Sequence, residues 1–224
     1  GAVTADLHVT GALSAPMVEG KLSAADGTVG GVSFRAAEAD VSYADGRVSF
    51  QNLTAELFGG KVSGTGIFDT ANKSYTAHLT VDGVSLAQLR ANDVPLPEGL
   101  DGTVSADLGV SGQGAELSSL AVYGSAQALD GAYRAIPVEH ASASFALRGN
   151  DLTIDFLSIK LPNDTELGIE GRIMGGALLD LRFYGAHADL ALLNGLDDRL
   201  SFSGLSDFTG EVHGDIRDPH VHLQ

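Results

Sequence analysis

Apolar and polar residues alternate one by one through most of this chain. Clear runs are Val48–Phe50, Leu53–Leu57, Val104–Val110 and Leu152–Phe156. Successive side chains of a β-strand point to opposite faces, so each run predicts a strand with one apolar face. Dipeptides that favour tight turns separate the runs: Asp26-Gly27, Asp45-Gly46, Gly59-Gly60, Gly149-Asn150 and Asn163-Asp164. The sequence therefore predicts an all-β chain, folded as a long antiparallel meander of about sixteen strands.

Helical spacing of apolar residues is found in two short stretches. Val84–Ala91 and His187–Leu196 each carry leucines three residues apart, so we predict a short helix in each. The first is followed by Asn92–Gly99, where Pro95 and Pro97 predict an exposed connection rather than a strand. The 29 glycines also favour many turns and bulges over long helices.

The chain repeats itself with a period of about one hundred residues. The glycines of Val9-Thr-Gly11, Val110-Ser-Gly112 and Val212-His-Gly214 stand 101 and then 102 residues apart. Each unit of such an array covers the edge of its neighbour, so we expect a longer array of which this chain is part. The predicted units are a first β repeat at 1–97, a second at 98–205 and the start of a truncated third at 206–224.

A short glycine-proline-glycine signature opens the first repeat. It reads Gly11-Ala-Leu-Ser-Ala-Pro16-Met-Val-Glu-Gly20, and Ala44-Asp-Gly46 and Phe58-Gly-Gly60 follow it in order. In this order and period the chain resembles the TamB and AsmA-like family of bacterial envelope proteins. The second repeat departs from the signature, because Gln113–Leu120 contains no proline. Its opening turn is therefore expected to differ.

The resemblance implies an elongated, strongly curved antiparallel sheet shaped like a trough. Proteins of this family are implied to be anchored in the inner membrane and to cross the periplasm. There they carry phospholipids between the inner and outer membranes and support outer-membrane biogenesis. The partners implied are phospholipid acyl chains and an outer-membrane barrel protein, the latter through parts of the longer protein outside this chain. We expect a central piece, because neither an anchor nor a barrel-docking end is recognisable.

An apolar strip of the sheet is the candidate binding surface. Two short helices cannot cover about sixteen strands, so the sheet must fold over on itself or leave the strip open. The candidate lining residues take the apolar phase of the clearest strands: Phe50, Leu57, Leu79, Val81, Leu108, Phe145, Leu152, Ile154, Phe156, Ile169, Leu181 and Phe183. Alternation alone favours a closed β core made of these residues. The resemblance favours an open groove for lipid tails.

Charge and chemistry argue against several other functions. The formal charge of −16 repels nucleic acid. No Gly-x-Ser-x-Gly elbow or other catalytic arrangement is recognisable, so we expect neither an enzyme nor a cofactor. His213, His220 and His222 lie near Asp215 and Asp218, where we expect a frayed strand rather than a metal site.

Two alternatives without catalysis remain open. A β-edge scaffold would add strands from unfolded outer-membrane barrel proteins during assembly, and would bind extended peptides instead of lipids. A glycan-binding or adhesive repeat would need polar aromatic platforms. The chain has no tryptophan and only five tyrosines, which do not cluster. The scaffold is therefore the stronger alternative.

Overall fold

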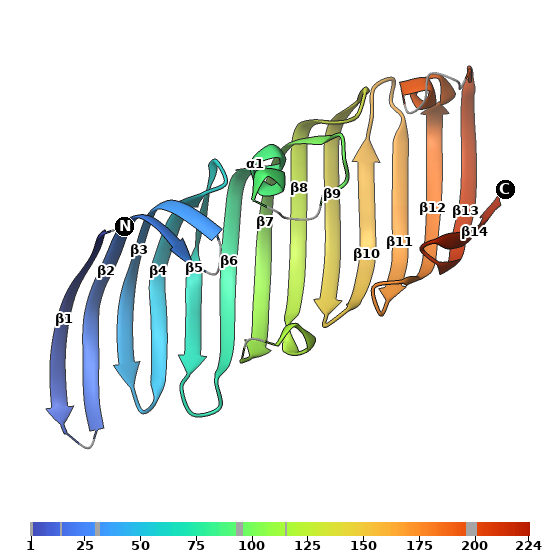
Figure 1. The fold of residues 1–224 in the computed structure, drawn as a ribbon. Helices are drawn as coiled ribbons and strands as arrows, with labels where there is room; N and C mark the ends of the chain where they lie inside the picture. The colour runs from blue at the N-terminus through green and yellow to red at the C-terminus, as the bar shows by residue number, and fades with distance from the viewer. Residues whose placement is uncertain (1, 14, 30–31, 93–95, 115, 196–200) are drawn as a thin grey trace.

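The fold is one long antiparallel sheet (Figure 1). The computed structural model describes residues 2–13, 15–29, 32–92, 96–114, 116–195 and 201–224. The strands are β1 (Ala2–Ala12), β2 (Ala15–Val29), β3 (Val32–Ala44), β4 (Arg47–Leu57), β5 (Gly60–Asp69), β6 (Ser74–Ser85), β7 (Leu100–Gln113), β8 (Ala121–Tyr133), β9 (Ile136–Arg148), β10 (Asp151–Lys160), β11 (Glu166–Met174), β12 (Leu178–Asp189), β13 (Leu205–Asp215) and β14 (Asp218–Leu223). Each strand pairs with the next along the chain. The predicted all-β meander is confirmed.

The sheet is open, because β1 and β14 occupy its two opposite edges (Figure 1). It has fourteen strands rather than about sixteen, since some strands run longer than predicted. The predicted turn at Asp26-Gly27 is wrong, because both residues lie inside β2. Asp45 and Gly46 do form the predicted turn, with φ of 49° and 76°, as a type I′ hairpin requires.

Only the first of the two predicted helices is an α-helix. α1 spans Leu86–Ala91, and Val84 and Ser85 belong to β6 before it. The Ser85 side chain caps the helix by accepting a hydrogen bond of 3.3 Å from the Gln88 backbone N–H.

The second helix prediction needs correction. The residues from His187 to Asp189 end β12, and a 3₁₀-helix, η2 (Leu190–Gly195), follows. Its last turn is held by Asn194, whose side chain exchanges two hydrogen bonds with the Phe202 backbone. The predicted end at Leu196 lies outside the described residues. A further 3₁₀ turn is η1 (Leu117–Ser119), and no helix in the described ranges is long and apolar enough to cross a membrane.

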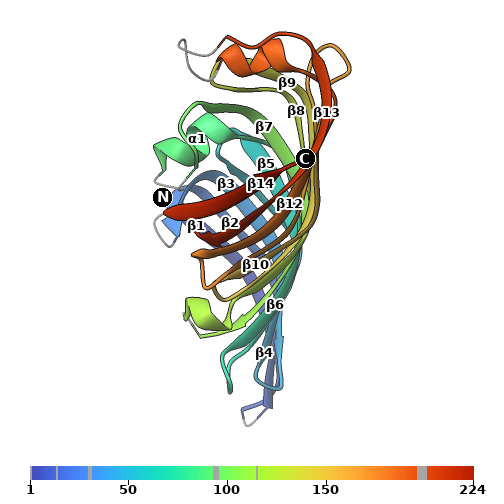
Figure 2. The same ribbon diagram turned by 90° about the vertical axis from the view of Figure 1, so that its right-hand side faces the viewer.

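β-bulges bend the sheet at regular intervals. The register shifts in β4 near Asn52, in β6 near Gly83, in β10 near Asp155 and in β12 near His187. An extra residue bends its strand and increases the local twist. The bulges of β4 and β6 thus recur six strands later in β10 and β12. Figure 2 shows the result, a curved wall with α1 on its hollow side.

Other features also recur after six strands. The repeat glycines Gly11, Gly112 and Gly214 lie in β1, β7 and β13. Asp26 in β2 and Asp130 in β8 both have a left-handed backbone, with φ of 47° and 50°. The helical segments α1 and η2 follow β6 and β12. The repeat boundaries at 97 and 205 stay predictions, and Pro95 of the predicted connection lies outside the described residues.

In the part of the chain that the structure describes, no second layer covers the sheet. Among the described residues, only six hydrophobic side chains are buried: Ala39, Val84, Leu86, Ile136, Leu161 and Ala188. The chain exposes 13942 Å² to solvent, whereas a compact monomer of its mass exposes roughly 9,600 Å². The alternating apolar residues therefore do not fill a closed core.

Candidate functional site

Cross-strand pairing sorts the side chains onto two faces. Residues directly opposite each other in an antiparallel pair share a face, so the faces can be followed from strand to strand. Leu79 of β6 pairs with Leu108 of β7, and their neighbours Thr80 and Asp107 pair on the other side. We call the side of Leu79 and Leu108 the inner face and the side of Thr80 and Asp107 the outer face.

The inner face is apolar from β1 to β14. Its described positions hold mainly aliphatic, aromatic, glycine and proline residues. The charged residues Arg35 of β3 and Glu139 of β9 also take inner-face positions, each near the start of its strand. Examples are Tyr75, Ala77, Leu79, Val81 and Val84 in β6, and Leu152, Ile154, Leu157 and Ile159 in β10. One apolar surface therefore runs across all fourteen strands.

The inner face lies on the hollow side of the curve. In β6, Leu79 and Val81 of the inner face are half-buried, whereas His78 and Thr80 of the outer face are exposed. Val84 is only 4% exposed where α1 follows β6, and α1 lies on the hollow side in Figure 2. The inner face therefore lines an open trough.

Eleven of the twelve predicted lining residues share this face. They are Phe50, Leu57, Leu79, Val81, Leu108, Phe145, Leu152, Ile154, Ile169, Leu181 and Phe183. Phe50 and Leu57 are an odd number of residues apart, which a regular strand would place on opposite faces. The bulge near Asn52 adds one residue to β4 and brings both onto the inner face.

Phe156 is the exception, and another bulge is the reason. The register of β10 shifts between Ile154 and Phe156, where Asp155 is the extra residue. Phe156 therefore points to the outer face, and it is 48% exposed. Leu157 occupies the next inner-face position in its place.

Sequence reasoning also missed inner-face residues. Leu53, Val62, Phe68 and Leu157 lie on the inner face by their pairing. Their apolar character was visible in the sequence, but only the register assigns each of them to a face. Each bulge inserts one extra residue, so the residues after it switch faces relative to simple alternation. Counting residues along a strand therefore assigns faces correctly only up to the bulge.

Glycines let neighbouring strands approach closely within the inner face. Gly124 of β8 pairs with Leu108, and a Cβ added there would lie 2.0 Å from the Asp107 backbone oxygen. Only glycine fits at that approach. At Gly210 an added Cβ would lie 2.3 Å from Cζ of Phe183, whose ring covers the glycine. Rings that lie over glycines protrude less from the floor of the trough.

Several charged residues of the outer face form exposed ion pairs. Nε of Arg182 in β12 lies 3.5 Å from Oε1 of Glu211 on one neighbouring strand. Nη1 of the same side chain lies 4.0 Å from Oε1 of Glu170 on the other neighbouring strand. Arg217 donates side-chain and backbone hydrogen bonds to Asp215, which lower the pKa of that carboxyl below its ordinary value of 3.8. Exposed pairs of this kind contribute little to stability. The outer face is therefore a solvated surface.

The histidines near the end of the chain belong to this outer face. Nδ1 of His213 lies 3.2 Å from Oδ1 of Asp180, and its Nε2 lies 3.3 Å from Oε2 of Glu211. His213 of β13 is directly opposite His220 of β14. In the part of the chain that the structure describes, no group of three or more His, Cys, Asp or Glu side chains could hold a metal ion.

A comparison with known families assigns the sheet to a group of proteins. The family model described as the TamB C-terminal domain matches residues 1–164. The chain belongs to the TamB family. Searches of curated proteins and of solved structures gave no match.

Membership of the TamB family gives the chain its general role. The family is a transport and assembly module of the bacterial envelope, and the chain has a role in the TamB system of outer-membrane assembly. The matched stretch ends in the turn after β10, yet the inner face continues into β11 without a break, since Leu157 pairs with Ile169. The resemblance predicted from the sequence is confirmed.

Proposed function

We propose that this chain carries phospholipids between the inner and outer membranes of the bacterial envelope, within a TamB-family protein of the periplasm. Acyl chains lie on the inner face, while the outer face stays in water. A single observation supports this proposal, namely an apolar face that crosses fourteen strands and that no second layer covers among the described residues. The chain itself performs no catalysis and needs no cofactor.

The dimensions of the inner face fit a conduit better than a pocket. Fourteen strands spaced by ~4.8 Å make a surface roughly 60 Å long. Each Å² of apolar surface removed from water is worth about 25 cal/mol, so covering this face with acyl chains is strongly favourable. Aliphatic walls make many weak, interchangeable contacts, which lets a lipid move from strand to strand.

The outer face suits a chain surrounded by the aqueous periplasm. Its ion pairs, such as Arg182 with Glu211, need no partner protein to satisfy them. An outer-membrane barrel protein is the proposed partner of the longer protein, and it would bind outside this chain.

Site-specific photo-crosslinking in cells tests the proposal. A photoreactive residue replaces Phe50, Ile154 or Phe183 on the inner face of the full-length protein. The matched controls replace Thr54, Thr153 or Arg182, which lie close by on the outer face. We expect phospholipid adducts at the three inner positions and at none of the outer ones.

The same experiment distinguishes the scaffold alternative. A scaffold that adds strands from unfolded barrel proteins would give protein adducts near the edges of the sheet and no lipid at Phe50, Ile154 or Phe183. Equal lipid labelling of both faces would also contradict the conduit, because it would report contact with a membrane surface rather than with the trough.

A further inference from the structure

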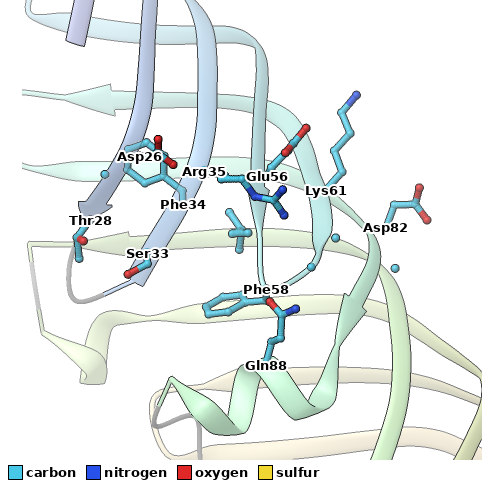
Figure 3. A pocket seen from close by; sticks show the side chains of 15 residues that line it. Asp26, Thr28, Ser33, Phe34, Arg35, Glu56, Phe58, Lys61, Asp82 and Gln88 are labelled. Atoms are coloured by element: carbon cyan, nitrogen blue, oxygen red, sulfur yellow. The ribbon is translucent and has the colours of Figure 1, made fainter. Parts of the chain in front are cut away.

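A cavity of about 790 Å³ opens at one rim of the trough, next to Leu57 of the inner face. It lies among the ends of β2 to β5, the end of β6 and the start of α1 (Figure 3). Asp26, Arg35, Glu56 and Gln88 are among the polar residues that line it. The inner face thus changes from apolar to polar at this rim.

The cavity holds charges of both signs without ion-pair partners. Its cations are Arg35 and Lys61, and its carboxylates are Asp26, Glu56 and Asp82. In the described part of the chain, none of these five side chains makes an ion pair. Lys61 lies directly opposite Glu56 on β4 and Asp82 on β6, so the five charged side chains share one cavity with an excess of one negative charge.

The position of Arg35 links this cavity to the trough. Arg35 precedes Ala37 by two residues in β3, and Ala37 pairs with Ala55 on the inner face. Glu56 and Lys61 pair with each other on the outer face. The cavity therefore crosses the rim, and Arg35 supplies a positive charge where the inner face ends.

We propose that this cavity binds the zwitterionic headgroup of a phospholipid, a phosphate joined to a primary ammonium, whose acyl chains lie on the inner face. This inference rests on the proposed function. Arg35 and the Gln88 amide donate hydrogen bonds to the phosphate, and Asp26 and Glu56 accept them from the ammonium. The cavity carries two cations and three carboxylates, so an anionic headgroup without an amine would add to its excess of negative charge and binds less well.

The second repeat lacks this arrangement at the corresponding rim. Glu139 follows the left-handed Asp130 as Arg35 follows the left-handed Asp26, nine residues later in each case. Leu161 and Thr165, which flank the turn between β10 and β11, are only 6% and 2% exposed. The headgroup preference is therefore a property of the first repeat, and the second repeat serves as an internal control.

The test compares headgroups captured at two inner-face positions. The purified chain carries a photoreactive residue at Leu57, beside the cavity, or at Phe183 in the second repeat. It is mixed with vesicles of equal parts phosphatidylethanolamine and phosphatidylglycerol that have identical acyl chains. Mass spectrometry of the adducts then gives the headgroup ratio at each position.

We expect adducts at Leu57 to be enriched in phosphatidylethanolamine relative to those at Phe183. The enrichment should be roughly two- to fivefold, the size of effect that one exposed charge pair supplies. Arg35→Glu, which introduces the residue type of the second repeat, should abolish the enrichment at Leu57 and leave the ratio at Phe183 unchanged. Lys73→Glu, in the turn between β5 and β6 and outside the cavity, is the matched control for charge and should change neither.

Each outcome bears on one of the two proposals. Equal ratios at Leu57 and Phe183, or an enrichment that survives Arg35→Glu, would overturn the headgroup site while the conduit stands. Absence of lipid adducts at both positions would overturn the conduit and the headgroup site together. Arg35 is exposed, so the variant is expected to fold, and circular dichroism checks that it does.

Discussion

The inner and outer faces are built by the same strands, yet they relate to water in opposite ways. Outer-face charges lie beside opposite charges on neighbouring strands, as Arg182 does beside Glu170 and Glu211. The inner face is apolar except for charged residues near strand ends, such as Arg35, and no second layer covers it among the described residues. A face that only had to stabilise a fold would be covered. Its exposure supports the proposal that acyl chains cover it.

The comparison also separates stability from function. Few side chains are buried, so the sheet depends mainly on backbone hydrogen bonds and on cross-strand contacts. Substitutions on the inner face should therefore reduce lipid binding more than they reduce the free energy of unfolding. Substitutions on the outer face should have little effect on either.

The largest expected effect comes from a charge placed on the inner face. Ile154→Asp should lower the phospholipid that copurifies with the chain by about tenfold or more, because a carboxylate among acyl chains is poorly solvated. The free energy of unfolding should fall by only about 1–2 kcal/mol, since Ile154 is half-buried. Lipid mass spectrometry and chemical denaturation give the two quantities.

Thr153→Asp is the matched control for that charge. Thr153 precedes Ile154 in β10 and pairs with Arg172 on the outer face, so a carboxylate there meets water and a cation. We expect bound lipid to stay at the level of the unmodified chain. A similar loss of lipid in both variants would contradict the separation of the two faces.

Two glycines test the contrast in stability between the faces. Gly124→Ala on the inner face should cost about 2–3 kcal/mol, because its Cβ would overlap the Asp107 backbone oxygen at 2.0 Å. For Gly109→Ala on the outer face, the three atoms nearest to the added Cβ all belong to the Tyr123 side chain. That ring is 62% exposed and can move into water, so we expect a cost of less than about 1 kcal/mol. Equal losses of stability in the two variants, measured by thermal unfolding, would show that the close backbone approach at Gly124 does not make an alanine there more costly.

The smallest expected effect concerns the outer-face ion pairs. Arg182→Gln should change the free energy of unfolding by less than about 1 kcal/mol, since the side chain is highly exposed. The difference should shrink further when urea unfolding is repeated in about 1 M salt, where screening is nearly complete. A larger loss of unfolding free energy that persists in salt would mean that the Arg182 side chain contributes packing contacts as well as ion pairs.

Local patterns predicted the class of fold, and most of the inner face, because alternation and turn chemistry are properties of adjacent residues. Asp45-Gly46 forms its predicted turn for that reason. The pattern fails where a bulge inserts a residue, as Phe156 shows, because nothing in the residue types around Asp155 marks the shift. Asp26-Gly27 fails similarly, since a left-handed residue can lie inside a paired strand.

The rim cavity could not be predicted from the sequence. Its lining comes from residues as far apart as Asp26 and Gln88, which only the curvature of the sheet and the position of α1 bring together. The η2 segment shows the same limit, because the leucine spacing that predicted it does not distinguish an α-helix from a 3₁₀-helix.

Two neighbouring residues of β10 offer the most direct test of the lipid trough. The chain contains no cysteine, so Leu157→Cys or Phe156→Cys introduces a single site for a fluorophore. Phospholipids with brominated acyl chains quench only fluorophores that they touch. We predict strong quenching at Leu157 on the inner face and little at Phe156 on the outer face, although both residues are apolar. Equal quenching at the two sites, or stronger quenching at Phe156, would contradict the assignment of acyl chains to the inner face.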